Sequence, residues 1–308
     1  MKKLLSSFFI IMMVLSLCAC GKSEAVKSAE SQITELSNSQ LETLEDIEQL
    51  AAKIQTAENA VESLSDKEKG KVGNMNVIDE AYTNLANAFD EITTQLYSQG
   101  EAVKSEDIQR LKKVYDILDD ANKNRIKNTD YLTALVFDSE VRDLSKSISV
   151  DSNNTIDRLQ TTYNSMSSEQ QELVTTSALF AECIVKEIEK YKNEGLNEIK
   201  TLISNNKDLL RKYDRLEECL VWYGRWASFV KVENKLKSRL NDPESYRLED
   251  GTVSNPFLDS KTGYYDVIVE LTYTRANGLG GRVRQQLAPS IVYFKINAND
   301  LTIEFKEI

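Results

Sequence analysis

The chain has 308 residues, with 38 basic and 49 acidic side chains that give a net charge of −11, three prolines, four cysteines and no histidine. Without histidine it lacks the commonest general base and metal ligand, which excludes Ser-His-Asp triads, Cys-His dyads and histidine-based zinc sites. The length suffices for one large or two ordinary domains, and the acidic balance disfavours nucleic acid as a partner. We therefore expect no nucleic-acid partner, no metal and no cofactor.

Residues 1–19 have the parts of a secretory signal peptide, with Lys2 and Lys3 before a short apolar run and small residues at a cleavage point. The run, Leu4 to Leu17, is shorter than the roughly 20 residues that a membrane-spanning helix needs. We predict a signal peptide that is removed. An uncleaved anchor and an ordinary secretory signal are the alternatives.

The sequence Leu17-Cys18-Ala19-Cys20 resembles the lipobox of bacterial lipoproteins. The resemblance implies cleavage before Cys20 and attachment of a diacylglycerol to the Cys20 thiol. Two acyl chains anchor a protein stably to a membrane without crossing it. We therefore expect a lipid-anchored protein on the extracellular face of the cell membrane, with the membrane as its first partner.

Residues 20–45 are rich in serine and glutamate and predict a solvated tether that passes into a helix near Gln40. No proline occurs before Pro243. Over residues 46–227 the apolar residues recur at helical spacing. This part of the chain is predicted to be a helical repeat bundle, so that the fold is mainly α.

Three copies of one pattern occur within the predicted bundle. Each has an apolar residue at its start, a second eight positions later and a third fourteen positions later. The copies are offset by 54 and 48 residues, which suits two or three helices per unit, stacked so that neighbours bury each other's apolar faces. The apolar positions are Leu64, Val72 and Ile78, then Leu118, Ile126 and Leu132, then Met166, Val174 and Phe180.

Each copy also has turn residues at matching places. Ser65, Asp119 and Ser167 are of types that cap the N-terminus of a helix. Asn74 and Asn128 are predicted to end a second helix in the left-handed conformation, while the third copy has a threonine, Thr176, at that place.

The pattern resembles the helical repeats of surface proteins of Gram-positive bacteria over about residues 50–190. The resemblance implies an architecture and is silent on activity.

The last predicted helices, from residue 183 to residue 240, include a basic stretch and an aromatic cluster. Residues 200–240 contain ten basic and five acidic side chains. This stretch predicts contact either with an anionic envelope polymer or with acidic parts of the same chain. Trp222, Tyr223 and Trp226 either bind a sugar or pack between neighbouring elements.

Two cysteines, Cys183 and Cys219, lie among these helical apolar positions. They either form a disulfide or act as small buried hydrophobic residues.

From Pro243 the apolar period changes from 3.6 to 2, which predicts strands near residues 246–253, 267–274, 291–296 and 301–305. The glycine-rich residues 277–281 predict a hairpin turn. Residues 228–308 are therefore predicted to form a small α+β domain with a three- to four-stranded antiparallel sheet. Arg275, Arg282 and Arg284 flank the hairpin and form either a positive tip or a solvated turn.

This region, through the strings LKSRLNDPESYRL and YTRANGLGGRV, resembles an uncharacterised module at the C-termini of Firmicute lipoproteins and phage-related proteins. The resemblance implies a fold and no activity.

The sequence predicts a non-catalytic binding or interaction module, with no residues assigned to catalysis. The expected partners are an envelope polymer or another surface protein. A structural stalk that presents the C-terminal domain and a hydrolase with paired carboxylates are the alternatives. The candidate ligand-binding residues are Trp222, Tyr223, Trp226, Arg275, Arg282 and Arg284.

Overall fold

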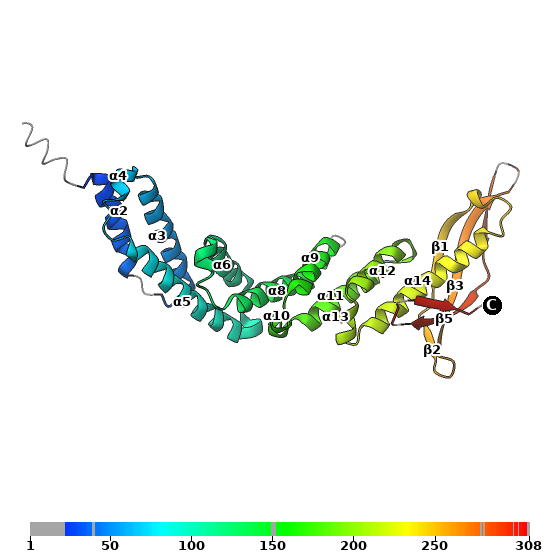
Figure 1. Ribbon diagram of the computed structural model, residues 1–308. Coiled ribbons are helices and arrows are strands. Elements are labelled where there is room, and N and C mark those ends of the chain that lie inside the picture. Colours follow the sequence, from blue (N-terminus) through cyan, green and yellow to red (C-terminus); the bar gives the residue numbers. More distant parts are fainter. Residues whose placement is uncertain are drawn as a thin grey trace, which may run out of the picture. The chain divides into compact units, whose positions relative to one another are not determined.

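A computed structural model describes residues 22–38, 41–148, 152–277, 279, 281–297, 299–300 and 302–306 (Figure 1). The predicted signal peptide and the lipidation site Cys20 lie outside these residues. The chain divides into two compact units, residues 1–139 and 140–308. The predicted fold class is confirmed, because helices occupy the chain up to Lys237 and an antiparallel sheet follows from Arg247.

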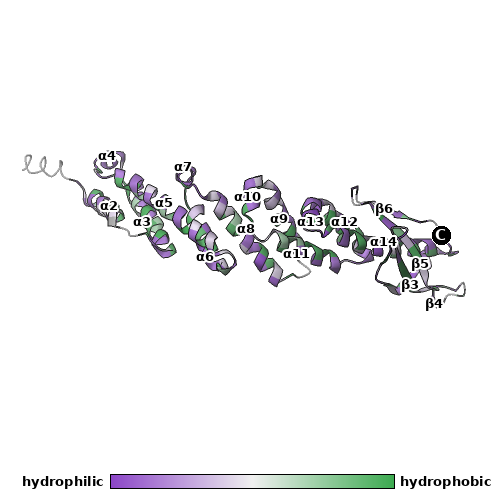
Figure 2. Ribbon diagram, turned by 90° about the horizontal axis from the view of Figure 1, so that it is seen from below, coloured by the Kyte–Doolittle hydropathy of each residue, from purple (hydrophilic) through white to green (hydrophobic). Residues whose placement is uncertain are grey.

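The first unit consists of helices with apolar residues on one side and hydrophilic residues on the other (Figure 2). Their apolar sides form one core that extends from Val26 to Leu132. The elements are α2 (Glu24–Glu35), η1 (Leu36–Asn38), α3 (Leu44–Glu62), α4 (Asp66–Lys69), α5 (Asn76–Gln99), η2 (Gly100–Ala102), α6 (Ser105–Asp116), α7 (Asp120–Lys123) and the first part of α8 (Thr129–Lys146).

Helix α2 corrects the prediction of a solvated tether over residues 20–45. Ser23 caps this helix by accepting a hydrogen bond from the Val26 N–H. Val26, Ala29 and Ile33 are completely buried in the core. Their spacing of three and four residues forms an apolar stripe, which the high content of serine and glutamate concealed. Folded structure therefore begins close to the predicted lipidation site.

The predicted helix caps of the three copies are confirmed. Ser65 with Glu68, and Ser167 with Gln170, form reciprocal capping boxes. The Asp119 carboxylate accepts a hydrogen bond from the Asn122 N–H at 2.8 Å. Each cap satisfies backbone N–H groups that the first turn of a helix leaves without partners.

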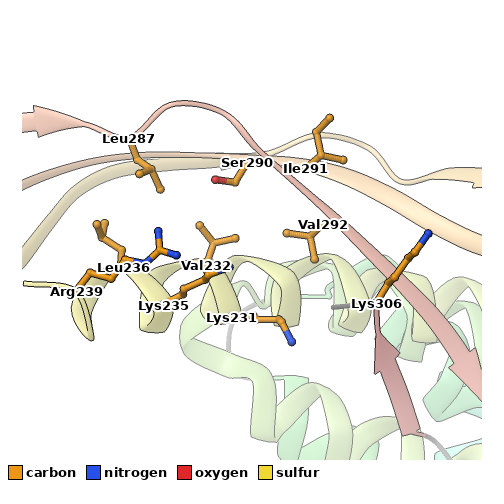
Figure 3. Close-up of a pocket in the computed structure, with 10 residues that line it drawn as sticks. All are labelled: Lys231, Val232, Lys235, Leu236, Arg239, Leu287, Ser290, Ile291, Val292 and Lys306. Carbon is orange, nitrogen blue, oxygen red and sulfur yellow. The ribbon is translucent and has the colours of Figure 1, made fainter. Parts of the chain in front are cut away.

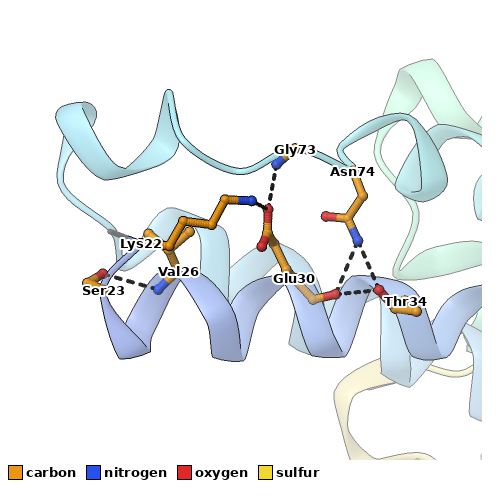
Figure 4. Close-up of polar contacts among 7 residues, drawn as sticks. All are labelled: Lys22, Ser23, Val26, Glu30, Thr34, Gly73 and Asn74. Carbon is orange, nitrogen blue, oxygen red and sulfur yellow. Dashed lines mark hydrogen bonds and ion pairs between the residues drawn. The ribbon is translucent and has the colours of Figure 1, made fainter. Parts of the chain in front are cut away.

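The prediction for Asn74 and Asn128 is wrong, because Asp214 is the sole non-glycine among the described residues with a positive φ. Each asparagine instead binds an earlier helix through its side chain, as Figure 4 shows for Asn74. The Asn74 amide donates to the Glu30 carbonyl at 3.1 Å and to the Thr34 hydroxyl at 3.0 Å. The Asn128 amide donates to the Asp90 carbonyl at 3.1 Å and to the Thr94 hydroxyl at 2.9 Å.

A carboxylate completes each of these two cross-links. Glu30 accepts a hydrogen bond from the Gly73 N–H at 2.8 Å, and Asp90 accepts from the Lys127 and Asn128 N–H groups at 3.0 and 2.8 Å. The first two copies therefore share one hydrogen-bonded cluster. It consists of an acidic residue, a threonine four positions later on the same helix, and an asparagine in a later loop. The backbone N–H groups of these loops donate to side-chain carboxylates, so the turns form without a residue in the left-handed conformation.

The helices of the second unit are the remainder of α8, then α9 (Ser152–Ser165), α10 (Ser168–Leu173), α11 (Ser177–Lys190), η3 (Asn193–Gly195), α12 (Leu196–Asn205), α13 (Lys207–Lys212) and α14 (Leu216–Lys237). Cys183 and Cys219 are buried and free. Burial raises the pKa of the Cys183 thiol to about 11 and that of Cys219 to about 12. Both act as small hydrophobic residues.

The C-terminal sheet has six strands in four lateral positions, which explains why three or four were predicted. Its elements are η4 (Pro243–Ser245), β1 (Arg247–Val253), β2 (Phe257–Asp259), β3 (Tyr264–Ala276), β4 (Arg282–Gln286), β5 (Ser290–Asn297) and β6 (Thr302–Phe305). The long strand β3 pairs with β1 and β2 along one edge and with β4 and β5 along the other. Strand β6 pairs with β5 alone.

Helix α14 packs against one face of this sheet. A Cβ atom on Gly224 would lie 2.3 Å from the Phe294 ring, and one on Gly251 would lie 2.4 Å from the Phe229 ring. Both glycines therefore permit a close approach of helix and sheet that any larger residue would prevent. The buried contacts include Phe229, Val232 and Leu236 from the helix.

The asparagine cross-link can be tested by Asn128→Ala. Loss of the two hydrogen bonds that the amide donates is expected to lower the free energy of opening around this loop by about 1–2 kcal/mol. Native-state hydrogen exchange of the Lys127 and Asn128 backbone amides, which donate to the Asp90 carboxylate, measures this change. The control is Asn124→Ala, whose exposed side chain makes no contact that spans the repeat. Equal exchange in the two variants would contradict the assigned role.

Candidate functional site

A groove of about 240 Å³ lies between helix α14 and strand β5 in the C-terminal part of the second unit (Figure 3). Figure 3 shows residues of α14, and Arg239 from the turn after it, on one side and residues of the β4–β5 connection and β5 on the other, with Lys306 at one end. The lining residues are Lys231, Val232, Lys235, Leu236, Arg239, Leu287, Ser290, Ile291, Val292 and Lys306.

The floor of the groove is apolar. Val232, Leu236 and Val292 are buried there and belong to the core between helix and sheet. Ile291, which borders the groove, is 47% exposed because its side chain alternates with that of Val292 and points away from α14 (Figure 3). The groove therefore offers hydrophobic surface to a ligand without any rearrangement of the core.

The rim of the groove is cationic. Lys231 and Lys235 are exposed and four residues apart, so they lie along one side of α14, and the exposed Arg239 follows four residues later in the turn after the helix. None of the described residues that line the groove is acidic. The acid on this stretch of the helix, Glu233, pairs with a different lysine, Lys237, at 2.9 Å.

The four cations have no acidic partner within the part of the chain that the structure describes. Two of them lie over aromatic rings: the Lys231 ammonium is 4.5 Å from the centre of the Phe305 ring, and the Lys306 ammonium is 5.7 Å from that of Tyr293. Such contacts orient an ammonium group but leave its charge uncompensated. The groove therefore suits a ligand with both negative charge and apolar surface.

The predicted aromatic cluster is mainly a packing element. Trp226 is 7% exposed and lies in the core between helix and sheet, 6.2 Å from Trp222 between ring centres. The Arg225 guanidinium lies 5.1 Å from the Trp222 ring and donates to the Val253 carbonyl. The Trp222 ring donates its N–H to the Tyr191 carbonyl at 3.0 Å, and Tyr223 is half-buried.

Trp222 also borders a second pocket, of about 450 Å³, that gathers four carboxylates. Burial, followed by repulsion from Glu218 and Glu182, raises the pKa of Glu189. Glu217 accepts a hydrogen bond from the Tyr265 hydroxyl at 2.5 Å. The fourth carboxylate belongs to Asp214, whose backbone has a positive φ. The acidic lining residues are Glu189, Asp214, Glu217 and Glu218.

The three predicted arginines of the hairpin do not come together in a pocket. Arg275 donates to the Gln285 side chain at 3.0 Å, and Arg282 donates to the Ser245 carbonyl at 2.7 Å. Arg284 pairs with Glu249 at 2.7 Å, although its side chain remains 71% exposed. None of the three lines the groove beside α14.

Sequence reasoning noticed the positive charge of residues 200–240 but did not locate the groove. The interval of four residues between Lys231, Lys235 and Arg239 indicates in the sequence that these cations lie on one side of a helix. The opposite wall of the groove could not be predicted from the sequence, because it depends on which strand lies beside the helix.

Three further observations bear on function. From residue 22 onward, no described helix is both long and apolar enough to span a membrane. The described residues contain no group of three or more cysteine, aspartate or glutamate side chains placed to hold a metal ion. No family model, curated protein or solved structure matches the chain. Its function must therefore be argued from the geometry of the groove.

Proposed function

We propose that the protein is a non-catalytic binding protein, lipid-anchored on the extracellular face of the cell membrane, that binds an anionic ligand in the groove between α14 and β5. The groove carries this proposal, because four cations that have no acidic partner among the described residues surround an apolar floor. Cations that face a ligand favour negative charge on it, and the apolar floor adds hydrophobic affinity. The lipobox-like sequence before Cys20 supports the anchor.

The anchor can be tested by Cys20→Ala. This change removes the thiol that would receive the diacylglycerol, so metabolic labelling with a palmitate analogue should be lost and the chain should no longer fractionate as a mature lipoprotein. Cys18→Ala is the matched control, since it alters the neighbouring cysteine that cleavage would discard. Retention of label in Cys20→Ala would contradict the anchor.

The groove can be tested by Lys235→Glu in a chain of residues 21–308, which holds every described helix and strand. Decanoate and a capped peptide of alternating glutamate and valine serve as anionic probes with apolar surface. Reversing one rim charge is expected to weaken binding about tenfold, measured by calorimetry.

The control for this experiment is Lys200→Glu, an equal change of charge on α12 at an exposed residue that does not line the groove. It should leave both affinities unchanged. A cationic amphiphile, decyltrimethylammonium, should not bind. If neither anionic probe binds, or if both charge reversals weaken binding equally, the proposed function is wrong.

A hydrolase with paired carboxylates is the second candidate, and the acidic pocket beside Trp222 is the observation that favours it. Glycosidases need two carboxyl groups, one of which is protonated because of a raised pKa. Burial raises the pKa of Glu189 in this way, and Glu217 lines the same pocket. Cleavage of envelope polysaccharide by the chain, and its loss in Glu189→Gln but not in Glu182→Gln, would establish this function in place of simple binding.

A structural stalk remains the third possibility. The repeated cross-links of the first unit, which tie loops to earlier helices, support a rigid element of this kind.

A further inference from the structure

Strands β4 and β5 follow one another along the same side of β3, separated by residues 287–289. Both pair with β3, β4 through Arg282–Gln286 and β5 through Ser290–Phe294. On the side away from β3, the partner strand β6 reaches only the far part of β5, from Phe294 to Asn297. The described residues provide no strand beside β4 or beside the start of β5.

The direction of the backbone groups along this edge follows from two hydrogen bonds. The Lys306 N–H donates to the Tyr293 carbonyl at 3.0 Å, so the Tyr293 peptide group faces β6 and, by alternation along the strand, the Ile291 group faces the same side. The Leu287 N–H donates to the Leu271 carbonyl at 2.8 Å, so Gln286 and Arg284 face away from β3. Arg284, Gln286 and Ile291 thus direct backbone donors and acceptors toward the open edge.

This edge lies in the most acid-poor part of an acidic chain. Residues 276–298 contain no aspartate or glutamate, although the whole chain has 49 such residues. They contain three cations, Arg282, Arg284 and Lys295, and the rim of the groove adds four more from α14, from the turn after it and from the end of β6.

Hydrophobic side chains lie at the same place. The half-buried Leu287 lines the groove beside α14. Ile291, 47% exposed, borders the groove, but its side chain lies on the opposite face of the sheet, next to the exposed Ile268 of β3 (Figure 3). A strand that pairs with the edge would place alternate side chains toward this groove.

We propose that the open β4–β5 edge binds an extended, acidic peptide segment of a partner protein, which adds to the sheet as a strand beside Ile291. Main-chain hydrogen bonds to the edge provide the register. Side chains of the segment alternate between the two faces of the sheet, so its carboxylates meet Lys235, Arg239 and Lys306 on the α14 face. Its apolar residues lie on the opposite face, beside Ile291. This inference rests on the proposed function and names the class of ligand that the groove accepts.

The same features have a protective role in many proteins, which keep sheet edges from pairing by means of charged residues and proline. Pro289 and the cations could act in this way alone. In that case no peptide would add to the edge, and the two roles are separated by the following experiment.

The experiment measures how a fluorescent, capped peptide of about eight residues, with alternating glutamate and valine, binds to the full-length chain in a neutral detergent. Fluorescence anisotropy gives the affinity. Hydrogen exchange gives the protection of the Ile291, Gln286 and Arg284 amides. We expect binding, slower exchange at these amides, and at least about a tenfold loss of affinity when the peptide is N-methylated throughout, because it then cannot donate backbone hydrogen bonds.

A second pair of variants changes the edge itself. Ile291→Pro removes the backbone N–H that faces the edge and should weaken peptide binding about tenfold, whereas Ile291→Val keeps it and should bind as the unaltered chain does. Circular dichroism shows whether each variant is folded. If Ile291→Pro is unfolded, the N-methylated peptide and the exchange data decide alone.

The outcomes separate this inference from the proposed function. If the N-methylated peptide binds as well as the ordinary one and the amides stay unprotected, the groove binds anionic ligands without strand addition, and the inference is wrong while the proposed function stands. If decanoate binds but the peptide does not, the inference fails in the same way. If the chain instead dimerises through this edge in sedimentation experiments, the occupant is a second copy and the inference is also wrong.

Discussion

The close packing of α14 on the sheet is the constraint on which the C-terminal part of the structure depends. This helix of 22 residues contacts α11, α12 and α13 as well as β1, β3 and β5. The contact requires Gly224, because any side chain there would collide with Phe294. Since the helix buries residues against two different sets of neighbours, its buried residues do not follow a single stripe. The groove exists because α14 continues past the point where β6 stops covering β5.

Several charged side chains are paired in the first unit, whereas the cations beside the groove are not paired with acids among the described residues. Exposed ion pairs contribute little to stability, and in the first unit they lie within one helix, as Lys112 with Asp116 does, or between helices that are already packed, as Arg110 with Glu48 does. In contrast, the cations beside α14 have no acidic partners among the described side chains. Carboxylates were available in a chain with a net charge of −11, so their absence over residues 276–298 is a local property. A surface that keeps its positive charge uncompensated is suited to an external anion.

Much of the fold could be predicted from the sequence, because its signals are local. Helix caps at Ser65, Asp119 and Ser167 depend on residues three positions apart, and the change of period after Pro243 is visible in a few residues. The role of Asn128 could not be predicted, since its partners Asp90 and Thr94 lie 38 and 34 residues earlier. The same reason explains the extra strands. Five-residue β4 has no apolar alternation, and it is a strand because β3 is long enough to pair with two segments on each side.

The candidate site was the least predictable part, because its two walls come from elements that the sequence does not connect. The basic stretch of α14 was visible, but the strand that faces it was not. The aromatic cluster, which has a conspicuous sequence, proved to be mainly packing, since Trp226 and Phe229 fill the space between helix and sheet. Conspicuous residue types thus indicated the core, whereas the groove is formed by lysines that are ordinary on any helix surface.

An open sheet edge has to satisfy two opposed requirements. It must accept a partner and yet avoid pairing with other copies of itself, which is the usual hazard of an exposed edge. Positive charge on both sides of the edge meets both requirements, because two such edges repel each other while an acidic strand is attracted. Pro289, in the connection between β4 and β5, shortens the stretch over which two identical edges could align. The positive charges that favour an acidic partner strand therefore also prevent the exposed edge from pairing with a second copy of itself.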